Sequence, residues 1–73
     1  MAGKNHTITK HIATIGESSF RTLELNKVAW GHNPPKFDLR NWVSDEPLKG
    51  ICFDQNEATA LYYALGQELG ISK

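Results

Sequence analysis

Residues 36–43 alternate strictly between two kinds of side chain. Phe37 and Leu39 have one parity, and the residues of the other parity are Lys36, Asp38, Arg40 and Trp42. A period of two is typical of a strand with one buried face and one face in water. We therefore expect Phe37 and Leu39 in the core. The opposite face would hold two cations and an exposed indole, which indicates a binding surface.

Three other segments have the composition of strands, at about residues 6–16, 20–30 and 49–53. The first is rich in Thr and Ile, and the spacing of Ile12 and Ile15 breaks the period of two, which predicts a bulge or twist there. In the last segment, Ile51 and Phe53 are expected on the buried face. Clusters of Gly, Ser, Asn and Pro between these segments predict turns.

The period changes at Asp54. Asp54 and Glu57 have the spacing of a capping box, which predicts the start of a helix. A stripe of Leu61, Leu65 and Leu69 follows at helical spacing, and Gly70 suits the helix end. We expect a helix over residues 54–70 whose leucine stripe helps to cover the sheet.

These elements predict an α+β fold in which four antiparallel strands precede one C-terminal helix. The 73 residues would form a single domain, 1–73, in which 1–5 is a flexible N-terminus. A monomer of this size buries only about 60% of its unfolded surface, so it is marginally stable. With Cys52 as the only cysteine, no internal disulfide can help, and we expect a homodimer.

Charge and composition limit the classes of function. The net charge is zero, but residues 1–53 hold seven Lys and Arg against five Asp and Glu, whereas residues 54–73 hold one against three. No apolar run reaches the ~18 residues of a membrane span, and no secretory signal is evident, so a cytoplasmic protein without a membrane partner is expected.

Catalytic signals are weak. Cys52 has no histidine at a local spacing, and the three histidines, His6, His11 and His32, lack the spacing of metal ligands. We expect surface histidines, no metal, no cofactor and no small-molecule substrate, and hence no enzyme. The competing hypothesis is an enzyme that uses Cys52 or a histidine.

Binding of single-stranded nucleic acid requires cations for phosphates and flat side chains for unstacked bases. Arg40 and Trp42 share one face of their strand, Trp30 ends the preceding strand, and Lys36 begins the next. Further cations could form a rim around them: Arg21, Lys27 and Lys49. Two interpretations remain open, since Trp30 and Trp42 could instead pack against each other or a dimer partner. A further alternative is a protein-interaction module that docks a partner on the Trp42 face.

The chain also resembles a known family. Asp38-Leu39-Arg40, a following aromatic residue, Lys49-Gly50-Ile51 and a helix that opens at Asp54 look like the transcriptional coactivator positive cofactor four. The segment from Glu24 to Trp30 looks like its bacterial YdbC-type relatives. The resemblance covers about residues 8–69.

This resemblance implies a strongly curved four-stranded sheet, a C-terminal helix and a homodimer joined through helices and sheets. Its paired grooves would hold single-stranded DNA, and by extension RNA, with little sequence preference, in transcription, replication or repair. Arg40 then matches a backbone-contacting arginine, and Lys49 matches the lysine before Gly-Ile. The remaining matches are Trp30 and Trp42 near base-stacking positions, and Lys27 and Lys36 through the bacterial pattern. Leu48 stands where the eukaryotic family has another basic residue, so more reliance on stacking is expected.

Overall fold

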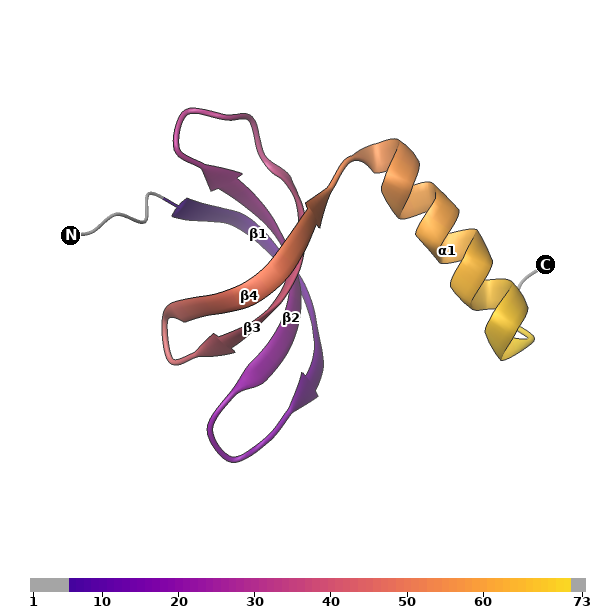
Figure 1. Ribbon diagram of the computed structural model, residues 1–73, viewed down its shortest axis with the longest axis horizontal. Helices are drawn as coiled ribbons and strands as arrows, with labels where there is room; N and C mark the ends of the chain where they lie inside the picture. Colours follow the sequence, from indigo (N-terminus) through magenta and orange to yellow (C-terminus); the bar gives the residue numbers. More distant parts are fainter. Residues whose placement is uncertain (1–5, 72–73) are drawn as a thin grey trace.

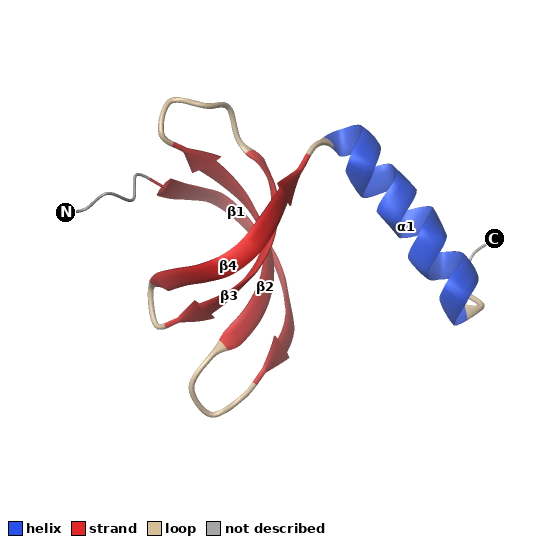
Figure 2. Cartoon of the chain, viewed as in Figure 1, coloured by secondary structure: helices blue, strands red, loops and turns tan. Residues whose placement is uncertain are grey.

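The computed structural model describes residues 6–71 and contains a four-stranded antiparallel sheet followed by one helix (Figures 1 and 2). The elements are β1 (His6–Glu17), β2 (Thr22–Trp30), β3 (Lys36–Val43), β4 (Glu46–Phe53) and α1 (Gln55–Leu69). The predicted α+β architecture is confirmed. The expected flexible segment 1–5 lies outside the described residues.

The strands lie in the sheet in the order in which they occur in the chain, β1-β2-β3-β4, and every neighbouring pair is antiparallel. The register of β1 on β2 shifts between Ile8 and Lys10, between His11 and Ala13, and between Thr14 and Gly16. The last two shifts span Ile12 and Ile15, so the predicted irregularity is confirmed. Because bulges increase the local twist of a strand, these shifts help to coil the sheet.

Curvature gives the sheet two unlike faces. The concave face is formed by Asn26, Val28, Trp30, Asp38 and Arg40, and the strands bow so that their opposite, convex face lies toward α1 (Figure 1). The positions of His6 and Trp42 show how strongly the sheet is curved. His6 pairs with Trp30 and Trp42 pairs with Thr22, at opposite ends of β2. The ring centroids of His6 and Trp42 are nevertheless only 5.4 Å apart.

The observed burial of side chains contradicts part of what the sequence predicted for β3. Asp38 and Trp42, expected on a solvated face, are only 0% and 3% exposed. Phe37 and Leu39, expected in the core, are only partly buried. Coiling of the sheet is the reason, because the side chains on the same face of β3 as Asp38 and Trp42 lie inside the concave face.

The helix begins and ends as its residues predict. The Asp54 carboxylate accepts from the Glu57 backbone N–H at 2.8 Å, and the Glu57 carboxylate accepts from the Asp54 backbone N–H at 2.9 Å. This reciprocal pair is a capping box. Gly70 closes the helix with φ of 76°, a left-handed conformation that costs glycine little.

The expectation that the leucine stripe covers the sheet is wrong for the single chain. The helix extends away from the sheet (Figure 2), and Leu61, Leu65 and Leu69 are 39%, 51% and 66% exposed. The expectation for Ile51 is wrong as well, because it is 58% exposed. Only Asp54 separates β4 from α1, which is too short a link to turn the helix back across the sheet. In the described part of the chain, α1 is neither long nor apolar enough to cross a membrane.

Candidate nucleic-acid interface

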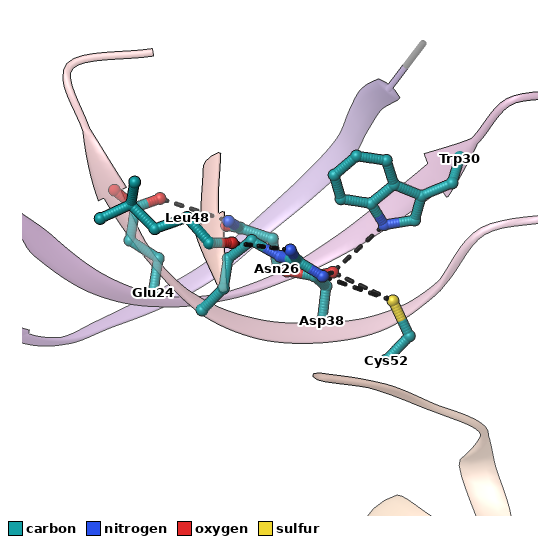
Figure 3. Close-up of polar contacts among 7 residues, drawn as sticks. Glu24, Asn26, Trp30, Asp38, Leu48 and Cys52 are labelled. Carbon is teal, nitrogen blue, oxygen red and sulfur yellow. Dashed lines mark hydrogen bonds and ion pairs between the residues drawn. The ribbon is translucent and has the colours of Figure 1, made fainter. Parts of the chain in front are cut away.

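The Asp38 carboxylate is the centre of the concave face. Strict alternation along β3 places Asp38 and Arg40 on this face, and Cys52 is the cross-strand partner of Asp38 on β4. Arg40 donates to both carboxylate oxygens, from Nε and Nη2, at 2.7 Å each. Trp30 Nε1 and Cys52 Sγ each donate to Oδ2 at 3.2 Å, and Figure 3 shows both side chains directed at Asp38. One buried carboxylate therefore holds an arginine, an indole and a thiol in place.

These contacts shift the pKa values of the cluster. Burial raises the pKa of Asp38, but hydrogen bonds from Arg40, Cys52 and Trp30 and the positive charge of Arg40 outweigh it, so the pKa lies below its usual value of 3.8. The hydrogen bond to Asp38 raises the pKa of Arg40. Burial, with the hydrogen bond to Asp38 and the charge of that carboxylate, raises the pKa of Cys52. The cluster is thus a fixed ion pair beside a neutral thiol.

A second polar network adjoins this cluster. Asn26, the cross-strand partner of Asp38, is fully buried and donates from Nδ2 to Glu24 at 3.2 Å. Its Oδ1 lies 2.6 Å from Nδ1 of His11, and Thr22 donates to Glu24 at 2.6 Å. These bonds give the buried amide partners at both ends, which buried polar groups require. The two networks make the middle of the concave face rigid.

Two open hollows meet at Trp30, which is partly exposed. One, of about 450 Å³, is lined by Arg40, Lys49 and the β4 residues around them. The other, of about 520 Å³, is lined by Val28, Asn33, Pro34, Lys36 and Cys52. The structure therefore brings together Trp30, Lys36, Arg40 and Lys49 of the residues singled out from sequence.

Arg40 has a part in this site that the resemblance does not imply. Its Nε and Nη2 bind Asp38, its Nη1 donates to the Leu48 carbonyl at 2.9 Å, and its guanidinium lies 4.7 Å from the centre of the Trp30 ring. Most of its donors are occupied within the chain. Arg40 thus positions Trp30, while Lys36 and Lys49 are exposed and form no ion pair with another described residue.

Trp42 is a correction to the predicted site. Its side chain is 3% exposed and its ring lies against that of His6. Trp42 therefore offers almost no exposed surface in this structure. Its predicted part in base stacking and the protein-docking alternative both required such a surface. Its burial follows from the coil of the sheet, which brings the start of β1 over the end of β3.

Lys27 and Arg21 are not brought to Trp30. Lys27 lies on the convex face, with its ammonium 4.8 Å from the centre of the Phe37 ring. It is directly opposite Lys10 of β1, an arrangement of like charges that costs stability. Arg21 precedes β2 and lines a separate hollow of about 210 Å³ beside Gly16 and Asn41.

Two residues of the site were not identified from the sequence. His6 was expected at the surface, but its ring contacts both indoles, at 5.3 Å from Trp30 and 5.4 Å from Trp42. No local pattern signals this contact, because it depends on tertiary coiling. Asp38 could have been found, since an Asp-x-Arg pair on one face of a strand has the spacing of an ion pair.

The enzyme hypothesis gains no support from Cys52. Nucleophilic cysteines have a lowered pKa, and here burial and Asp38 raise it. Within residues 6–71, no three His, Cys, Asp or Glu side chains are grouped closely enough to hold a metal ion.

Fold and site together define a small coiled-sheet protein with an aromatic side chain between two cation-bearing hollows. Comparison with models of known protein families and with curated proteins found no match to the chain.

Proposed function

We propose that this protein binds single-stranded nucleic acid, with little preference for sequence, as a homodimer. The observation that carries the proposal is the pair of hollows that meet at Trp30, with Lys36 in one and Lys49 in the other. This geometry suits a flexible polyanion, because a base can contact the indole while the flanking phosphates approach the two ammonium groups. The resemblance to positive cofactor four points to the same ligand.

Trp30 is suited to stacking because its orientation is fixed in advance. Its Nε1 is bonded to Asp38 and Arg40 lies over its ring, so little side-chain entropy is lost when a base arrives. The buried ion pair of Asp38 and Arg40 is neutral as a unit. Phosphate attraction therefore depends on Lys36 and Lys49, and the salt dependence of binding should be shallow.

The proposal of a dimer rests on the convex face of the sheet. An apolar hollow of about 320 Å³ lies between the convex face and α1, and its lining is entirely apolar or aromatic: Ile15, Leu25, Phe37, Leu39, Phe53, Ala58, Leu61, Tyr62 and Leu65. Tyr62 is 70% and Leu65 51% exposed in the single chain. An exposed apolar surface of this kind marks an interface. A second copy that covers it leaves both concave faces open.

The test is a fluorescence anisotropy titration of labelled oligothymidine, the matching duplex and an RNA oligomer across a salt series. We expect the single strands to bind more tightly than the duplex. Trp30→Ala should weaken binding by about 5- to 150-fold, since stacking contributes ~1–3 kcal/mol per base. Lys36→Ala and Lys49→Ala should each reduce the salt slope by about 0.7.

Lys10→Ala is the matched control, because it removes one exposed positive charge from the convex face. It should leave the affinity for oligothymidine nearly unchanged. Equal losses for Lys10→Ala and Lys36→Ala would show that binding is governed by net charge and not by the hollows at Trp30. Preference for the duplex would refute the proposal.

A further inference from the structure

His6 lies between the two indoles of the protein. Its ring centroid is 5.3 Å from that of Trp30 and 5.4 Å from that of Trp42, with interplanar angles of 42° and 56°. A flat, five-membered aromatic ring thus fills the gap between the two largest aromatic side chains. It reaches that gap only because the sheet is coiled.

This packing leaves two polar atoms without partners. Nε1 of Trp42 and Nδ1 of His6 are buried and have no hydrogen-bond partner among the described residues. Trp42 itself is 97% buried, since it is 3% exposed. Buried polar nitrogens are normally bonded, and leaving one unbonded costs free energy. The imidazole therefore fills the space between the indoles without meeting the hydrogen-bonding needs of the site.

A hollow of about 280 Å³ opens beside these atoms, lined by His6, Ile8, Glu24, Trp42, Ser44 and Asp45. Two carboxylates at its walls repel a phosphate. A pyrimidine base suits the site better, because it is flat, its carbonyl oxygens can accept from an indole N–H, and its N–H groups can donate to a carboxylate.

We propose that the gap between Trp30 and Trp42 is a second base-stacking site, which His6 closes in the free protein. The inference rests on the proposed function and adds a regulation to it. A pyrimidine of the bound strand enters the gap as His6 leaves, and Trp42 then takes part in stacking. The contacts that fix Trp30 are unchanged by this exchange, because Asp38 and Arg40 bind that indole independently of His6.

The position of His6 in the sheet lowers the free energy needed to displace its side chain from between the indoles. It is the first residue of β1, which is an edge strand. Of the residues that the structure describes, only His6, Thr7 and Ile8 pair with β2 before the first register shift. Such a short piece of ladder at the start of an edge strand can open locally without unfolding the rest of the sheet.

The decisive experiment compares His6→Ala with the full chain in the oligothymidine titration. If the open site is a minor state of about 10% or less in the free protein, removing the ring should tighten the apparent Kd by about tenfold or more. His32→Ala, in the exposed loop between β2 and β3, is the matched control and should bind like the parent. Unchanged or weaker binding by His6→Ala, with the parent still binding, overturns the inference alone. No binding by either protein refutes the proposed function.

A measurement on the parent protein guards against misfolding of the variant. The ring protons of His6 lie beside two indoles, so ring currents should displace their NMR signals from those of the exposed His32. Addition of oligothymidine should move the His6 signals toward the His32 position. Signals of His6 that stay displaced while those of Trp30 shift would contradict the exchange.

Discussion

At the scale of single residues, Asp38 determines how the concave face is held. It is fully buried, and among the described residues its side-chain hydrogen bonds come from residues of the candidate site: Trp30, Arg40 and Cys52. A buried carboxylate is costly unless it is paired and hydrogen bonded. Here both conditions are met, so the charge fixes the indole and the guanidinium in one arrangement.

Asp38→Asn should destabilise the protein by about 3–5 kcal/mol at neutral pH, because it leaves the charge of Arg40 without its partner. The pKa of Asp38 is lowered on folding. Its contribution to stability is therefore complete above its unfolded pKa of about 3.9 and is lost as the pH falls through the lower folded value. Urea unfolding between about pH 2 and pH 7 measures this, and the difference between parent and variant should shrink below about pH 4.

Asp45→Asn is the control, because Asp45 lies in the exposed turn between β3 and β4. Its effect should stay within about 0.5 kcal/mol, as for most surface substitutions. A loss for Asp38→Asn that is as large at the acid end as at neutral pH would show that charge is not its cause.

At the scale of elements, β3 and β4 lie in close contact at Gly50. A Cβ placed there would overlap the Cβ of Arg40 and the carbonyl oxygen of Leu39. The register of the two strands also shifts between Arg40 and Trp42. Glycine at this point thus lets β4 close over β3 and brings Lys49 beside Trp30. The Lys-Gly-Ile sequence has a structural reason that does not depend on any ligand.

Gly50→Ala should cost about 1–3 kcal/mol, as expected when a methyl group is forced into packed atoms. It should also weaken oligothymidine binding, because Arg40 must move. Gly16→Ala is the matched control, since a Cβ at Gly16 meets nothing within 4 Å. Thermal unfolding and anisotropy would measure both effects, and equal stability of the two variants would argue against the close approach.

At the scale of the whole molecule, the single chain leaves its apolar surface uncovered. α1 contacts the sheet only sparsely, through β3, and large side chains such as Ile51, Leu69 and Ile71 are 58%, 66% and 71% exposed. Among the described residues, those buried in the concave face include the polar Asn26 and Asp38 beside the apolar Val28 and Trp42. Stability of this fold is therefore expected to depend on protein concentration, as it does when a partner copy completes the core.

Leu65→Lys should convert the proposed dimer to a monomer, because it places a charge in the apolar hollow between α1 and the convex face. Gln67→Lys adds the same charge on an exposed position of the helix outside that hollow and should leave the dimer intact. Light scattering after size-exclusion chromatography measures the mass. A parent protein with the mass of one chain at all concentrations would refute the dimer.

Local patterns were sufficient for the elements and their order. The alternation over residues 36–43 predicted β3, and the Asp54 and Glu57 spacing predicted the start of α1. Both signals depend on residues close together in the chain. The same patterns failed on burial: the parity of Trp42 is right, but its expected exposure is wrong.

The sequence by itself determined the four strands, the helix with its caps, and the placement of Asp38 and Arg40 on one face of β3, because these follow from short-range geometry. Only the tertiary structure decided which face is enclosed, that His6 lies between Trp30 and Trp42, and that Lys27 lies on the opposite side of the sheet from Trp30. Those outcomes depend on the accumulated coil of the bulged sheet. Coiling sums small twists over all of the strands, and no single stretch of sequence displays it.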